Sequence, residues 1–248
     1  MAGTEAEAAA LLRAARQGTT APLADLPAAL RPADQAGAYA IQRAAAEGIA
    51  IGGWKVGAAG PDKPCFCAPM PAAGLAASPA RLPRGRLRFI EAEVAFRIAH
   101  DLPPRATPYS RAEIIAALAT AHPAIEVLES AFADPDAVAP ATNLADSVAH
   151  GGFVHGPGRA DWQGLDFATM TVTQTVDGAA ITRTGNPAGD MIRLVEWLAN
   201  EGSRWAGGLR AGQFVTCGSW TGKTPAAAGG QARVSFPGLG EAAVGFAA

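Results

Sequence analysis

The segment Arg88–Ile98 reads Arg-Phe-Ile-Glu-Ala-Glu-Val-Ala-Phe-Arg-Ile and indicates both the fold and the candidate chemistry of this chain. Its residues alternate with a period of two, which is typical of a half-buried β-strand. One face carries apolar residues from Ile90 to Ile98, and the other carries Glu91 and Glu93. The Cα atoms of these two glutamates are roughly 7 Å apart, so their carboxylates repel each other unless a positive charge lies between them. The segment therefore predicts either a hard divalent cation, such as Mg²⁺ or Mn²⁺, or a solvated face with two ordinary charges.

Length, composition and charge limit the number of domains and the kinds of partner that we expect for this protein. The 248 residues are 49% hydrophobic and 17% charged, which allows one large domain or two small ones. The net charge of −2 gives little support to nucleic-acid binding. The sequence contains no apolar run of membrane-spanning length, and its acidic start is unlike a signal peptide. Three cysteines, an odd and sparse number, fit a reducing compartment. We therefore expect a cytoplasmic protein that binds neither nucleic acid nor membranes.

The first fifty residues are rich in alanine and predict two helices. Thr4 and Glu7 have the spacing of a capping box for a helix that runs to about residue 16. Asp34 is placed to cap a second helix over about residues 35–47. We expect these helices to form a helical lid or packing arm.

Lys55 stands between glycines and apolar residues in Gly53-Trp54-Lys55-Val56-Gly57. The apolar neighbours suggest partial burial, and a buried lysine is costly unless it pairs with a carboxylate or an anionic ligand. The pattern equally fits a lysine that extends its ammonium into solvent from a short strand. Residues 61–88 are rich in proline and glycine and predict an irregular segment over a site. We expect residues 61–80 to be mobile without ligand.

The middle of the chain predicts a third carboxylate near the first strand. Ser110 and Glu113 have the spacing of a capping box for a helix to about residue 121. Residues 124–129 then predict a strand in an apolar context, which could return beside the first one. Either Glu126 or Glu129 could face inward, and the periodicity does not decide between them.

The second half of the chain is predicted to be mostly β-structure. Residues 132–160 predict a long connection, and Asp177-Gly178 predicts a type I′ hairpin. Asn186 is placed to cap a helix over 187–200, and two strands, at about 231–236 and 241–246, close the chain. Helices first and strands later favour an α+β fold.

Two segments resemble binding motifs but lack residues that those motifs require. Cys65-Phe66-Cys67 has no further cysteine or histidine partner at the spacing of a zinc site. Gly218–Thr224 resembles the end of a phosphate-binding P-loop, but Cys217 stands where its first glycine should be, and proline follows where a helix should start. We therefore expect neither a zinc site nor nucleotide binding.

Four segments occur in an order that resembles a known family. They are Gly53–Gly57, Ile90–Phe96, Ala124–Val127, and Ala199-Asn200 followed by Gly212-x-x-Val215-x-x-Gly218-Ser219. From about residue 35 to its end, the chain resembles the fumarylacetoacetate hydrolase superfamily, and most of all its 2-keto-4-pentenoate hydratase branch. The resemblance implies an α+β fold, a mixed β-sandwich or roll with an N-terminal helical arm. It also implies a homo-oligomer in which residues 1–80 form the helical arm and lid segment and residues 81–248 form a β-rich metal-binding catalytic domain.

The resemblance also implies the site. It implies Mg²⁺ or Mn²⁺ held by Glu91, Glu93 and Glu126, with Lys55 as the active-site lysine. It implies that three hydroxyls bind the substrate, those of Ser219, Thr221 and Ser147. The alternative is that these hydroxyls only make hydrogen bonds within turns or helix caps.

The reaction implied is that of a lyase of aromatic catabolism, which adds water to a small 2-oxo-4-enoate through a metal-bound enolate. Hydratases of this branch carry an acidic residue after the lysine, whereas the matching stretch here, Cys65–Met70, has none, and Asp62 is the nearest candidate. Two alternatives follow from this difference. The chain could decarboxylate a 2-oxo diacid at the same site, or it could be a catalytically reduced member that only binds a ligand. The resemblance also implies that hydrolytic members of the family activate water with a histidine–glutamate pair on an N-terminal lid. Hydrolysis is disfavoured here because all four histidines lie beyond that region, at His100, His122, His150 and His155.

Overall fold

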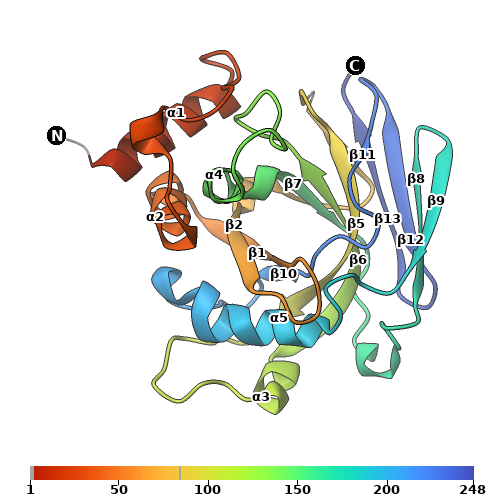
Figure 1. Ribbon diagram of the computed structural model, residues 1–248. Helices are drawn as coiled ribbons and strands as arrows, with labels where there is room; N and C mark the ends of the chain where they lie inside the picture. Colours follow the sequence, from red (N-terminus) through yellow and green to blue (C-terminus); the bar gives the residue numbers. More distant parts are fainter. Residues whose placement is uncertain (1–2, 84) are drawn as a thin grey trace.

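The computed structural model describes residues 3–83 and 85–248, so Met1 and Ala2 of the expected arm, and Arg84, lie outside the described residues. In the described part, the strands form two mixed sheets of eight and five strands. Figure 1 shows α1 (Thr4–Arg16) and α2 (Gln35–Ala46) beside the larger sheet. They lie on the side away from β8 (Thr171–Val176) and β9 (Ala179–Thr184) of the smaller sheet. The α+β class predicted from the sequence and the sandwich-like architecture implied by the family resemblance are both confirmed.

The larger sheet contains the strands that carry the predicted lysine and the predicted metal-binding glutamates. Its strand order is β2–β1–β10–β5–β6–β7–β3, with β11 paired to β5. The bounds are β1 Ile51–Ala58, β2 Cys65–Pro71, β3 Leu75–Ala77, β5 Phe89–Ile98, β6 Leu118–Leu128, β7 His150–His155, β10 Phe214–Thr216 and β11 Thr224–Pro225.

The smaller sheet has the order β4–β13–β12–β8–β9 and packs over the larger one. Its strands are β4 Ala80–Leu82, β8 Thr171–Val176, β9 Ala179–Thr184, β12 Gln231–Phe236 and β13 Gly240–Phe246. The predicted hairpin at Asp177-Gly178 and the predicted closing pair of strands are both confirmed.

The period-two pattern of β5 separates the core from the candidate site. Ile90 and Val94, on one face, lie in a single core cluster with Val234 and Val244 of the smaller sheet. Glu91 and Glu93 therefore project from the opposite face, away from that sheet. The strand predicted at residues 88–98 is confirmed.

The helices are short, and the first two form the N-terminal arm. They are α1 Thr4–Arg16, α2 Gln35–Ala46, α3 Arg111–Ala116, α4 Pro140–Ala145 and α5 Met191–Trp197. The Asp34 side chain accepts a hydrogen bond of 2.9 Å from the Gly37 backbone N–H, so the predicted cap of α2 is confirmed. The capping box predicted for α1 is wrong, because Gly3 is the N-cap and the Thr4 hydroxyl donates to Glu5.

Asp34→Ala is expected to lower the free energy of unfolding by about 1 kcal/mol, because a backbone N–H at the start of α2 loses its acceptor. Asp34→Asn is the matched control, since its side-chain oxygen can still accept that bond. Urea unfolding of the three proteins measures the effect. Equal stability of Asp34→Ala and wild type would contradict the capping role.

Two segments predicted to lack regular secondary structure contain strands or a helix. Residues 61–88 contain β2, β3 and β4, so the prediction of an irregular segment is wrong. Pro69 and Pro71 are tolerated because β2 is an edge strand, where a missing N–H breaks no ladder. Residues 132–160 likewise contain α4 and β7 instead of a plain connection.

Two helix boundaries also differ from prediction. The Ser110–Glu113 capping box is present, but α3 ends at Ala116, because the chain pairs with β5 from Leu118 onward. Strand pairing with β5 therefore overrides the local helix propensity of alanine and leucine. The later helix, α5, begins at Met191 with Asp190 as its cap, not at residue 187. Asn186 instead donates to the Cys217 carbonyl oxygen at 2.8 Å.

The division at residue 80 and the mobile lid over residues 61–80 stay predictions. Strands β1, β2 and β3 precede residue 80, yet they share a sheet with β5 and β6. Across residues 3–83 and 85–248, no helix combines the length and apolar character needed to cross a membrane.

Candidate active site

Three carboxylates converge where β5 and β6 pair. Glu91 and Glu126 are direct partners in the antiparallel ladder, and Glu93 lies two residues further along β5 on the same face. One oxygen from each carboxylate lies within 4.8 Å of the others. Glu126 is fully buried, Glu93 is nearly so, and Glu91 is partly exposed. Within residues 3–83 and 85–248, no other group of histidine, cysteine or acidic side chains has this metal-site geometry.

The structure distinguishes between the two candidates for the third carboxylate. Glu126 lies inside β6 and faces Glu91, whereas Glu129 lies just beyond the strand end. The Glu129 carboxylate accepts hydrogen bonds from the backbone N–H groups of Arg86 and Leu87, so it closes a loop instead. Periodicity could not separate the two glutamates, because β6 is buried on both faces.

Lys55 reaches the carboxylates through strand register. It is the parallel partner of Thr216 in β10, which in turn pairs with β5. Its Nζ lies 2.7 Å from Glu126 Oε1 and donates to the Val148 carbonyl oxygen at 3.1 Å. The side chain is buried and paired, so the solvent-extended alternative is wrong. An ammonium has three N–H donors, and these two contacts leave one for an oxygen of a ligand.

The electrostatics of the site favour a bound cation. Burial raises the pKa of Glu91 to about 7, against the opposing charge of Lys55. Burial and the neighbouring Glu126 raise the pKa of Glu93 well above its usual value. Burial also acts to raise the pKa of Glu126, but Lys55 and His150 outweigh it and the net shift is downward. Burial acts to lower the pKa of Lys55, but the three carboxylates raise it overall. One ammonium therefore does not neutralise the cluster.

The donor set fits a hard divalent cation. Glu126 Oε1 is already engaged, whereas Glu126 Oε2 is buried and has no hydrogen-bond partner among the described residues. Such an orphaned carboxylate oxygen is costly unless something positive contacts it. Mg²⁺ and Mn²⁺ prefer carboxylate oxygens, and three carboxylates leave further positions for water or a substrate.

The three predicted hydroxyls have different surroundings. Ser219 is close to the carboxylates, because the next residue, Trp220, donates its N–H to the Ala92 carbonyl oxygen at 2.9 Å. Ser219 Oγ is buried, and it lies close enough to the Glu91 carboxylate to act to lower the pKa of that group, against the larger effect of burial. Thr221 Oγ1 accepts from the Ala92 N–H and donates to Gln174 Oε1. To donate to a substrate oxygen, Thr221 would have to give up its bond to Gln174, because a hydroxyl has a single O–H.

Ser147 opens an unusual turn that sequence reasoning missed. Ser147, Val148 and Ala149 have φ values of 55°, 50° and 56°, in the left-handed region. That conformation costs an L-residue about 1–2 kcal/mol and is rarest for β-branched valine. The turn brings His150 to the site, where Nδ1 lies 2.8 Å from Glu126 Oε1. Nδ1 is the donor in this bond, because a carboxylate only accepts.

No signal in the sequence points to His150, because its role depends on the pairing of β6 with β7. Thr216 is a second residue that sequence reasoning missed, and its hydroxyl donates to the Glu93 carboxylate. Asp62 is the acidic residue nearest to Cys65–Met70, the stretch that lacks the acid of the hydratases. It is exposed on the turn between β1 and β2.

The chain is similar to proteins described as 2-keto-4-pentenoate hydratases. It is 30% identical to 2-keto-4-pentenoate hydratase 1 of Dechloromonas aromatica (strain RCB) over 263 residues, which cover 98% of this chain and 97% of that protein. It is also 30% identical to 2-keto-4-pentenoate hydratase of Paraburkholderia phymatum over 159 residues, 63% of this chain. That match spans 60% of the relative's length. No family model matches the chain.

The fold is also found in solved structures. The chain superposes on 4-oxalocrotonate decarboxylase from Pseudomonas putida G7, complexed with calcium and acetate, with a TM-score of 0.80 at 21% identity, over 98% of this chain and 96% of that one. The same enzyme complexed with magnesium and adipate gives a TM-score of 0.79. A yeast fumarylacetoacetate hydrolase family protein gives 0.59 at 11% identity, over 78% of this chain and 91% of that one.

Proposed function

Because the chain belongs to the fumarylacetoacetate hydrolase superfamily, on its 2-keto-4-pentenoate hydratase branch, we propose that it is a metal-dependent hydratase that adds water to a 2-oxo-4-enoate. The substrate is a small 2-oxo acid, and the cation is Mg²⁺ or Mn²⁺. Enzymes of hydratase or decarboxylase kind share the need to stabilise an enolate next to a carboxylate. The proposal therefore depends on whether this site can stabilise the negatively charged oxygen of an enolate.

One observation carries the proposal: a buried lysine lies within a cluster of three buried or partly buried carboxylates. Lys55 Nζ contacts Glu126 Oε1 at 2.7 Å. Glu91 and Glu93 complete the cluster. An arrangement that served only for stability would pair charges one to one, because an unpaired buried carboxylate is costly. Three carboxyl groups share one ammonium, and a cation bound beside it would allow all three to ionise, which supports a metal site.

A divalent cation held by Glu91, Glu93 and Glu126 would polarise the keto group of a 2-oxo acid as a Lewis acid. The free N–H of Lys55 can donate to the oxygen on which negative charge develops when C3 loses its proton. Ser219 Oγ, which is buried beside the Glu91 carboxylate, can donate to a second oxygen of the substrate once a cation engages that carboxylate. Burial excludes bulk water, which strengthens both interactions.

Deuterium exchange at C3 of a simple 2-oxo acid in D₂O tests the shared enolisation step. The wild type is expected to catalyse this exchange when Mg²⁺ is added and to stop when the metal is chelated. A panel of 2-oxo-enoates and 2-oxo diacids then separates the reactions. Hydration removes the absorbance of the conjugated enoate without CO₂, whereas decarboxylation releases CO₂. A wild type that binds Mg²⁺ but exchanges no 2-oxo acid would be a ligand-binding member and not an enzyme.

A further inference from the structure

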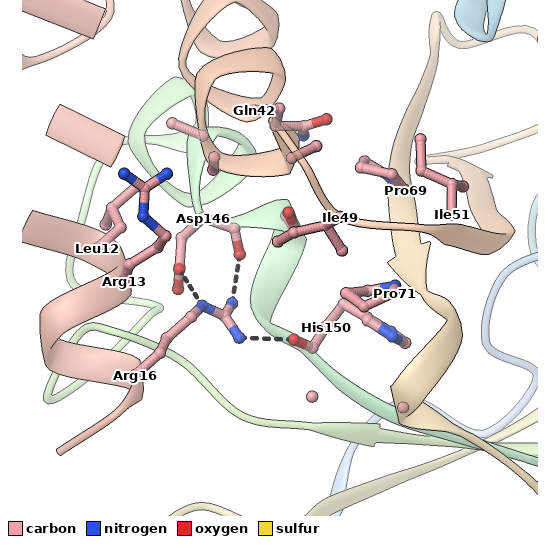
Figure 2. Close-up of a pocket in the computed structure, with 16 residues that line it drawn as sticks. Leu12, Arg13, Arg16, Gln42, Ile49, Ile51, Pro69, Pro71, Asp146 and His150 are labelled. Carbon is pink, nitrogen blue, oxygen red and sulfur yellow. Dashed lines mark hydrogen bonds and ion pairs between the residues drawn. The ribbon is translucent and has the colours of Figure 1, made fainter. Parts of the chain in front are cut away.

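Arg16, in the last turn of α1, binds both ends of the left-handed turn at residues 147–149. Its Nε donates to Asp146 Oδ1 at 2.6 Å, and its Nη2 donates to the Asp146 carbonyl oxygen at 2.7 Å. Its Nη1 donates to the His150 carbonyl oxygen at 2.7 Å. Figure 2 shows these three bonds at the wall of a cavity of about 220 Å³. One guanidinium therefore links the residue before the turn to the residue after it.

The turn held in this way presents two groups to the candidate active site. The Val148 carbonyl oxygen accepts from Lys55 Nζ, and the His150 imidazole donates to Glu126 Oε1. Both contacts come from residues within or next to the turn, and neither comes from the strands that carry the carboxylates. If the turn relaxed, Lys55 would lose one of its two oxygen contacts and Glu126 would lose the imidazole.

The turn needs support from outside itself. Three successive L-residues with positive φ are unfavourable, and Val148 is β-branched. Asp146 supplies part of this support, because its Oδ2 accepts from the Ser130 hydroxyl at 2.6 Å. Arg16 supplies the part that spans the turn. Its planar fork of donors is rigid, whereas a lysine ammonium is a compact charge that cannot reach all three acceptors in the same way.

We propose that Arg16 is a positioning residue: by clamping the turn from Asp146 to His150, it holds the Val148 carbonyl on Lys55 and the His150 ring on Glu126. The inference rests on the proposed function for its effect on catalysis. It assigns to α1 of the N-terminal arm a direct part in ordering the site.

The test compares Arg16→Gln with wild type in the full-length protein. Loss of a partner that orients site residues typically costs roughly 10–100-fold, so kcat for C3 exchange should fall by that factor with little change in KM. Mn²⁺ affinity should weaken in the same variant. Arg16→Lys should recover kcat only in part. Arg13→Gln is the matched control, because Arg13 lies on the same helix and its Nη1 donates to the Ala44 carbonyl oxygen. This control should keep the wild-type kcat.

A second readout does not depend on turnover. The Glu129 N–H donates to the Ala149 carbonyl oxygen at 2.8 Å, so its hydrogen exchange reports on the turn. Exchange at Glu129 should be faster in Arg16→Gln than in wild type or Arg13→Gln. A variant that only melts at a lower temperature, with wild-type kcat, metal affinity and Glu129 protection, would overturn the inference.

The two proposals can fail separately. If wild type exchanges no 2-oxo acid, the proposed function fails, while the Glu129 amide still tests the clamp. If Arg16→Gln does not fold, Arg16→Lys takes its place, because it keeps the positive charge but not the fork of donors. Full kcat and full Glu129 protection in Arg16→Lys would then exclude a need for the guanidinium geometry.

Discussion

Lys55→Ala is expected to slow the Mg²⁺-dependent exchange of the C3 proton of a 2-oxo acid by about 10²–10³-fold, the usual cost of removing one donor to a developing oxyanion. The lysine is buried against Glu126, and its remaining N–H is the donor that the proposal assigns to the enolate oxygen. Its loss should change kcat more than KM, because the charge it stabilises grows in the transition state. Metal affinity should change little, because no carboxylate is removed.

Two further variants sharpen this prediction. Lys55→Arg should recover little activity, because a planar guanidinium cannot occupy the place of a compact ammonium between Glu126 and Val148. Lys63→Ala is the matched control, since Lys63 is an exposed lysine on the turn after β1 and should leave the rate unchanged. Rapid exchange by folded Lys55→Ala, within a few-fold of wild type, would exclude Lys55 from the chemistry.

Glu126→Gln is expected to weaken Mg²⁺ or Mn²⁺ binding by more than about 100-fold, because even the supporting partners of metal ligands contribute 10–100-fold. The substitution keeps the shape of the side chain but removes a ligand charge from the centre of the cluster. Glu91→Gln should weaken binding in the same direction. Isothermal titration calorimetry, or electron paramagnetic resonance of Mn²⁺, measures the metal affinity of the folded variants.

Glu129→Gln is the control for this prediction. Glu129 lies three positions after Glu126, but its carboxylate binds the backbone at Arg86 and Leu87. It should therefore keep wild-type metal affinity even if the loop loses stability. Unchanged metal binding in both Glu91→Gln and Glu126→Gln would show that the carboxylate cluster is not the metal site.

The local features of the fold could be predicted because each depends on residues close in sequence. The alternation of β5 separates its apolar and acidic faces within eleven residues, and both faces are where the pattern places them. The turn at Asp177-Gly178 and the cap at Asp34 are also local, and both are present. The boundary predicted for α3 was wrong because pairing with a distant strand overrode the local signal. The start predicted for α5 was wrong because Gly189 has a φ of 76° and Asp190, not Asn186, caps the helix.

The candidate site could be predicted only in part. Glu91 and Glu93 follow from one strand, but the choice of Glu126 came from the family resemblance and not from the residues. His150 could not be identified, because its contact with Glu126 requires β6 and β7 to pair and the intervening turn to adopt a left-handed backbone. Arg16 could not be identified either, since its partners lie more than a hundred residues away.

The sequence by itself determined that one strand of this protein carries two carboxylates opposite an apolar face, because side-chain direction in a strand depends on nothing but its period of two. Only the tertiary structure decided what surrounds those carboxylates. The register of four strands brings Lys55 and Glu126 to them. The pairing of β6 with β7 and the left-handed turn at residues 147–149 then bring in His150. Such contacts join residues that are distant in the chain, and their energies appear only once the chain has folded.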